Sequence, residues 1–68
     1  MGVYAIYVVS PEYVDYVVKD VLRLGGKIIS VSKLFGIVNA EVPDEYVTEI
    51  MKKEYVRMVE KSYPFGHM

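Results

Sequence analysis

The sequence predicts an α+β fold in which a four-stranded antiparallel sheet carries two helices on one face. Four short runs rich in β-branched and aromatic residues alternate with two segments of helical periodicity. Proline and acidic residues begin each helical segment, and a Gly-Gly pair follows the first. The order is therefore strand, helix, strand, strand, helix, strand. Two right-handed crossovers turn this order into the ferredoxin-like split βαβ arrangement, βαββαβ.

The first half of the chain supplies two strands and one helix. Residues 3–9 are apolar at every position, which predicts a central strand. Residues 10–12, Ser-Pro-Glu, offer an N-cap, a first helical position and a first-turn acid, so a helix is expected over residues 11–24. Its apolar stripe consists of Val14, Val17, Val18, Val21 and Leu22. Gly25 and Gly26 end the helix with positive φ, and residues 27–33 form the second strand.

The second half repeats the pattern. A turn at residues 34–36 precedes a third strand at 37–42. Pro43 and two acids open the second helix, whose apolar side is Val47, Ile50 and Met51. Residues 56–62 form the fourth strand. We expect residues 1–62 to be one domain and residues 63–68, which contain Pro and Gly without periodicity, to be a C-terminal tail.

Composition excludes most enzyme chemistry. The chain has 68 residues, no Cys and a single His at position 67, so thiol chemistry and a His-rich metal site are not available. A net charge of −1 and a pI near 5.7 argue against a nucleic-acid partner. No apolar run is long enough to cross a membrane. We expect a non-enzymatic protein without cofactor or metal.

Two helices can cover only one face of the sheet. If Val38, Ala40 and Val42 point to the helices, the other face carries Ile37, Asn39 and Glu41. An uncovered face with mixed apolar and polar residues is a natural docking surface. The fold alone leaves open whether this face meets a partner, a second copy or solvent.

An ordered series of motifs, with uninterrupted spacing, covers residues 25–68. It consists of Gly25-Gly26-Lys27-Ile28, Phe35 to Val42, Pro43 to Ile50, and Val56-Arg57-Met58-Val59-Glu60. This series resembles the propeptides of subtilisin-family serine proteases. The segment from Tyr4 to Leu24 matches more loosely.

The resemblance implies that the open face packs on two parallel surface helices of a protease. Glu60 matches the carboxylate that caps the N-termini of those helices, where unsatisfied N–H groups and partial positive charge favour an anion. Ser62 stands where a second capping acid is expected. The residues alone, without the resemblance, favour a solvated acid at the end of the strand, paired with Arg57 or Lys61.

The resemblance also implies that the tail lies in the protease substrate cleft. Met68 would fill the primary specificity pocket. Phe65, three residues earlier in the chain, would fill the large apolar pocket that accepts the fourth residue back from the cleaved bond. The remaining cleft-binding residues would be Tyr63, Pro64, Gly66 and His67. Extended peptides bind in this way through main-chain hydrogen bonds and alternate side chains. A terminus that binds nothing is the alternative.

The expected partner is therefore a subtilisin-like serine protease, bound within a precursor or as a separate molecule. The free domain is expected to be monomeric, with no nucleic-acid or membrane partner. Such a domain would inhibit the protease and could template its folding. It would be secreted with a precursor, or cytoplasmic as an independent inhibitor.

Two other functions share this strand order. An RNA-recognition module would use Tyr4 or Tyr7 for stacking, but Leu34, Ile37 and Ala40 replace residues that its aromatic motif requires. A small-molecule-sensing regulatory domain would pair with a second copy edge to edge, and no motif in the chain marks a ligand pocket.

Overall fold

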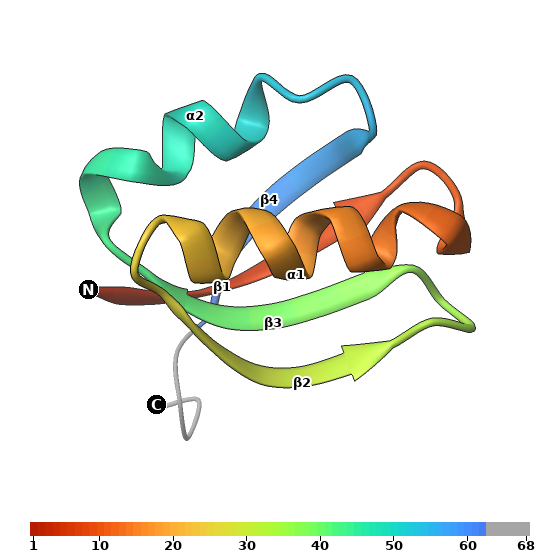
Figure 1. The fold of residues 1–68 in the computed structure, drawn as a ribbon, viewed down its shortest axis with the longest axis horizontal. Helices are drawn as coiled ribbons and strands as arrows, with labels where there is room; N and C mark the ends of the chain where they lie inside the picture. The colour runs from red at the N-terminus through yellow and green to blue at the C-terminus, as the bar shows by residue number, and fades with distance from the viewer. Residues whose placement is uncertain (63–68) are drawn as a thin grey trace.

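The computed structural model describes residues 1–62 and confirms the predicted ferredoxin-like α+β fold. Four antiparallel strands form one open sheet, and both helical segments lie on the same side of it (Figure 1). The elements in chain order are β1 (Gly2–Val8), η1 (Pro11–Tyr13), α1 (Val14–Arg23), β2 (Lys27–Ser32), β3 (Ile37–Val42), η2 (Asp44–Tyr46), α2 (Val47–Met51) and β4 (Val56–Ser62).

The strand order is β2-β3-β1-β4, so the wholly apolar β1 lies inside the sheet as predicted. β1 ends at Val8, one residue earlier than the apolar run, just after a register shift between Tyr7 and Val8 in the β1–β4 pairing. Val9 therefore lies outside β1, and its N–H donates to the Tyr55 carbonyl oxygen at 2.9 Å. A second shift, between Ile28 and Ser30, interrupts the β2–β3 pairing.

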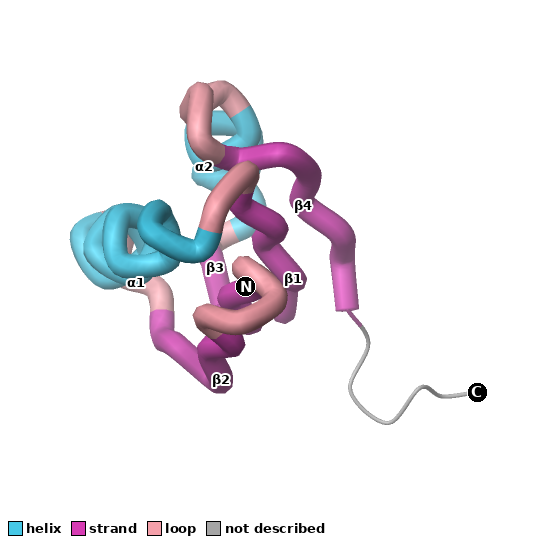
Figure 2. The backbone as a smooth tube through the Cα atoms, turned by 90° about the vertical axis from the view of Figure 1, so that its right-hand side faces the viewer, coloured by secondary structure: helices cyan, strands magenta, loops and turns pink. Residues whose placement is uncertain are grey.

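The core lies between the sheet and the helices, which Figure 2 shows on one side of the strands. Its members alternate along β1 and β3, because successive side chains of a strand point to opposite faces. The buried core residues are Tyr4, Ile6, Val8, Val14, Val17, Val21, Val38, Ala40, Val42 and Ile50. The prediction that Val38, Ala40 and Val42 face the helices is thus confirmed.

The first helix differs from the prediction in its start and in its buried stripe. A 3-10 turn occupies residues 11–13, and Ser10 makes no side-chain capping hydrogen bond, although its carbonyl oxygen accepts the Tyr13 N–H at 3.0 Å. Leu22, predicted to be in the stripe, is 57% exposed, whereas Asp20 is only 6% exposed. The buried side of α1 therefore includes Asp20 and not Leu22, because the Tyr55 hydroxyl donates a hydrogen bond to the Asp20 carboxylate.

The second α-helix begins later than predicted. Pro43 is extended rather than helical, a 3-10 turn follows, and α2 itself has five residues. Ile50 is buried, but Met51 is 54% exposed and does not belong to the apolar side as predicted. A helix of one and a half turns presents only one residue fully to the sheet.

The two glycines after α1 have different structural roles. Gly25 has φ +85° and ends the helix as predicted, with space around the position of a Cβ atom. At Gly26 a Cβ atom would lie 2.4 Å from the Glu41 carbonyl oxygen. Gly26 therefore permits the close approach of the chain to β3, and the prediction that both glycines have positive φ holds for Gly25 alone.

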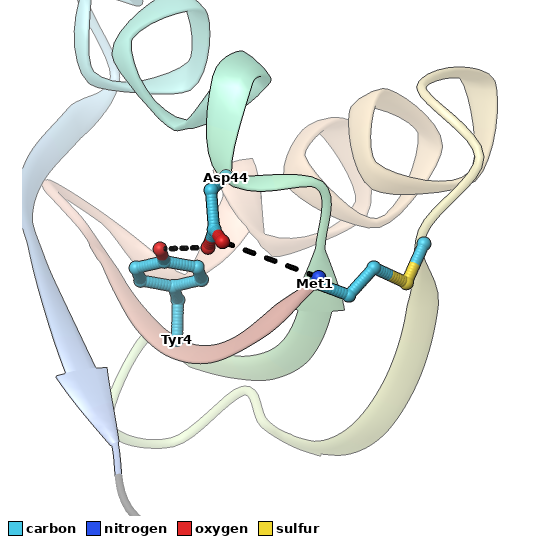
Figure 3. A network of polar contacts seen from close by, with 3 residues as sticks. All are labelled: Met1, Tyr4 and Asp44. Carbon is cyan, nitrogen blue, oxygen red and sulfur yellow. Dashed lines mark hydrogen bonds and ion pairs between the residues drawn. The ribbon is translucent and has the colours of Figure 1, made fainter.

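A polar network ties β1 to the start of η2 (Figure 3). The Tyr4 hydroxyl donates to Asp44 Oδ1 at 2.5 Å, and the Met1 amino group lies 4.0 Å from Asp44 Oδ2. The hydrogen bond from Tyr4 lowers the pKa of the Asp44 carboxyl, with smaller contributions from the amino terminus and Lys61. The Lys61 ammonium lies 5.8 Å from the centre of the Tyr4 ring. These contacts stand at the end of the sheet, beside the core.

Candidate functional site

The face of the sheet opposite the helices is the candidate docking surface, and we call it the open face. Residues that alternate with the core positions form it, and the strand register aligns them in three rows across the sheet. The rows, each read from β2 to β4, are Ser32-Ile37-Tyr7-Met58, then Ser30-Asn39-Ala5-Glu60, then Lys27-Glu41-Val3-Ser62.

The three rows differ in chemistry. The first is apolar through its centre, and Met58 in it is 49% exposed. The second is polar, with Asn39 Nδ2 donating to Ser30 Oγ at 3.1 Å. The third carries both signs of charge, with Lys27 paired in register to Glu41. The predicted docking residues Ile37, Asn39 and Glu41 therefore fall one in each row, and all three are half-buried.

Ala5 marks the centre of the open face. It is 7% exposed, yet it is not part of the core between sheet and helices. Its register partners Asn39 and Glu60 flank it on both sides. A small residue between two long polar neighbours leaves their side chains as the prominent features of this row.

Glu60 lies on the open face and is exposed. The Tyr7 hydroxyl donates to its Oε1 at 3.2 Å, and within residues 1–62 no other hydrogen bond or ion pair is formed by this carboxylate. The predicted alternatives, pairing with Arg57 or Lys61, are not formed. Because an ionised carboxylate offers about four acceptor sites, most of the acceptor capacity of Glu60 is unused within residues 1–62.

The hydrogen bond to Glu60 raises the pKa of the Tyr7 hydroxyl, and the negative charge of the carboxylate adds to this effect. The hydroxyl therefore keeps its proton and remains a donor at neutral and moderately alkaline pH.

Ser62 lies on the same face as Glu60, because two residues separate them along β4 and side chains alternate. It pairs in register with Val3 at the other end of the open face. The predicted capping pair is therefore placed on one surface.

The predicted cleft-binding residues lie outside the described residues. They are Tyr63, Pro64, Phe65, Gly66, His67 and Met68.

The helical side carries a second cluster that the sequence did not reveal. Tyr13 and Tyr55 stack with ring centres 5.5 Å apart, and Tyr16 meets both rings edge-on at 5.4 Å. The Tyr55 hydroxyl donates to Asp20, which also forms an ion pair with Arg23 at 3.2 Å. Only the four-residue spacing of Tyr13, Val17 and Val21 suggested that Tyr13 would lie near the core.

Two shallow hollows of about 220 and 240 Å³ adjoin Tyr55. The first is lined by Val9, Tyr13, Glu54 and Tyr55, and the second by Tyr16, Lys19, Asp20, Arg23 and Tyr55. Neither belongs to the open face. Their acidic and basic groups are not arranged as a nucleophile with a neighbouring base.

Within the described part of the chain, no three His, Cys, Asp or Glu side chains gather as a metal site would require. No helix in residues 1–62 has both the length and the hydropathy of a membrane span. Tyr4, one of two residues considered for stacking on RNA bases, is 8% exposed beneath the helices and is not on the open face. Tyr7 is therefore the only aromatic residue in the three rows of that face.

Comparisons with models of protein families, with curated proteins and with solved structures found no match.

Proposed function

We propose that this domain inhibits a subtilisin-like serine protease by placing its open face on two parallel surface helices of the enzyme. The proposal rests on the resemblance of residues 25–68 to subtilisin propeptides. The structural observation that supports it most is the position of Glu60. Glu60 is exposed on the open face, and its carboxylate accepts one hydrogen bond within residues 1–62, which leaves further acceptor sites unused.

An exposed carboxylate suits a helix N-terminus. The first four N–H groups of a helix have no partner within it, and the helix dipole adds partial positive charge at that end. Glu60 can accept hydrogen bonds from these groups, and Ser62 can contribute a neutral acceptor on the same face. The apolar row with Ile37, Tyr7 and Met58 can bury its surface against the helix side chains.

In the same proposal, residues 63–68 occupy the substrate cleft. β4 ends at Ser62, which lies on the open face with Glu60, and residues 63–68 follow it in the chain. Two linked contacts raise affinity well beyond that of either one, because the second binds at high effective concentration. The domain then needs no chemistry of its own to inhibit. A sheet that binds a helix pair can also help the protease to assemble that pair during folding.

Inhibition kinetics test this proposal. The chain is titrated into a subtilisin that hydrolyses a small chromogenic peptide. We expect tight, competitive inhibition. Deletion of residues 65–68 should weaken it by about 100-fold or more, because the second contact is lost. Glu60→Ala should weaken it by about 1–2 kcal/mol, the scale of a lost helix cap.

Glu54→Ala is the matched control, because Glu54 is an exposed acid outside the open face and the net charge changes equally. It should leave the inhibition constant unchanged. Absence of inhibition by the unaltered chain would refute the proposed function. Equal effects of the Glu60 and Glu54 substitutions would refute the capping role.

A further inference from the structure

A hydrogen bond between Tyr7 and Glu60 links two neighbouring strands across the open face and involves the carboxylate that is predicted to bind the partner. Tyr7 is on β1 and Glu60 on the edge strand β4. They are diagonal neighbours, because Tyr7 pairs with Met58 and Ala5 with Glu60. Diagonal pairs lie within reach of aromatic and long side chains.

An exposed glutamate at a sheet edge normally samples several rotamers, and a partner that binds it must restrict that freedom. Here the Tyr7 hydroxyl holds one carboxylate oxygen, Oε1, at 3.2 Å on the open face. The tyrosine itself is half-buried and lies in an inner strand, so its ring is a firmer support than a second surface side chain would be.

We propose that Tyr7 is a positioning residue for Glu60. Its hydroxyl holds the Glu60 carboxylate over the open face, in the orientation that receives N–H groups of the protease. This inference rests on the proposed function. By donating to Oε1, Tyr7 leaves Oε2 and the remaining lone pairs of the carboxylate available.

Glu60, held by Tyr7, therefore presents free carboxylate acceptors and no charged donor. This chemistry fits a surface on which several N–H groups converge, as they do at helix N-termini. It disfavours an acidic surface, since Glu60 would then meet like charge. The raised pKa of Tyr7 agrees with the geometry, because the hydroxyl stays protonated and continues to donate at neutral and moderately alkaline pH.

A double-mutant cycle on the full chain tests the assignment. The variants are Tyr7→Phe, Glu60→Ala and the double substitution, each measured for its inhibition constant against subtilisin. We expect Tyr7→Phe to weaken inhibition about 3–10-fold, the usual effect of losing one hydrogen bond. In the Glu60→Ala background the same substitution should have little effect, because the group that Tyr7 positions is gone.

Tyr16→Phe is the matched control. Tyr16 is 55% exposed on α1, outside the open face, and the substitution removes the same atom. It should change neither inhibition nor stability. Tyr7→Phe should still unfold in one cooperative transition and lose no more stability than one hydrogen bond contributes, which separates positioning from a general loss of structure.

The outcomes distinguish this inference from the proposed function. If the unaltered chain does not inhibit, both are refuted. If it inhibits and Glu60→Ala weakens it, but Tyr7→Phe has no effect, only the positioning role is refuted. Equal losses from Tyr7→Phe in both backgrounds would also refute it, because Tyr7 would then act through its own contact with the protease.

Discussion

At the scale of single residues, the burial of Asp20 is the feature that differs most from the helical periodicity of the sequence. Asp20 is the only polar or charged residue that is buried within residues 1–62. An ionised carboxylate is costly to bury unless it is paired and hydrogen-bonded. The Tyr55 hydroxyl donates to one oxygen of Asp20 and Arg23 pairs with the other, so these two contacts offset the cost of burying the carboxylate.

The Tyr55–Asp20 contact predicts a pH dependence of stability. Burial, followed by the hydrogen bond and the charge of Asp20, raises the pKa of the Tyr55 hydroxyl from 10.0 to about 12. Because the folded pKa is the higher one, the contribution of this group is fully present below pH 10. It is lost as the pH rises through 12.

We therefore expect Tyr55→Phe to lower the free energy of unfolding by about 1–2 kcal/mol at pH 7. The difference from the unaltered chain should stay constant up to pH 9.5 or so and shrink between pH 10 and 12. Urea unfolding followed by circular dichroism at each pH measures it. A difference that is constant or that grows across this range would contradict the role given to Tyr55.

The sequence could not have predicted this exchange between Asp20 and Leu22. Both neighbour the valine stripe of α1, and hydropathy places Leu22 inside and Asp20 outside. The outcome depends on Tyr55, which is thirty-five residues from Asp20 in the chain and reaches it only in the folded protein. Long-range polar pairs of this kind leave no periodic signal.

At the scale of elements, the strands and the order of the fold could be predicted, but helix length could not. Strands 37–42 and 56–62 agree with β3 and β4 residue for residue. Pro43 correctly marked the start of a helical segment, yet 3-10 turns precede both α-helices. Short 3-10 turns are frequent at helix N-termini and need no different composition.

The shortness of α2 concentrates its anchorage in one side chain. Ile50 is 2% exposed, while the adjacent Met51 is 54% exposed. We expect Ile50→Ala to lower the free energy of unfolding by about 2–4 kcal/mol, through lost burial and the cavity left behind. A domain of this size has roughly 3–10 kcal/mol in total, so the variant should be close to unfolded on warming.

Met51→Ala is the control for Ile50→Ala and should change the free energy of unfolding by less than about 0.5 kcal/mol. Thermal and urea unfolding of the two variants provide the comparison. Similar losses from both would mean that α2 is held mainly through its exposed side, against the packing described above.

At the scale of the whole molecule, the fold has one covered and one open face, and the sequence predicted this asymmetry. The alternation of β3 placed Ile37, Asn39 and Glu41 on the open face. The three cross-strand rows could not be predicted, because the register shifts near Ile28 and near Tyr7 are invisible in the sequence. The neighbourhood of Tyr7 and Glu60 depends on that register.

The open face combines apolar and polar rows on one surface. An apolar row lies beside a polar row that ends in Glu60 on the edge strand β4. A partner that matches this surface offers apolar side chains beside clustered N–H groups. The ends of two parallel helices satisfy both requirements. Single-stranded RNA is usually bound by stacking of its bases on two or three aromatic side chains of the sheet, and the three rows contain only Tyr7.

Methyl NMR on the two half-exposed methionines tests the docking of the open face most directly. Met58 lies on the open face and is 49% exposed; Met51 lies on the helical side and is 54% exposed. The chain, labelled at methionine methyl groups, is titrated with a subtilisin whose catalytic serine is replaced by alanine. The account predicts that the Met58 signal shifts or broadens while the Met51 signal stays unchanged. A shift of Met51 with Met58 unaffected would contradict it, as would no change at either methyl group.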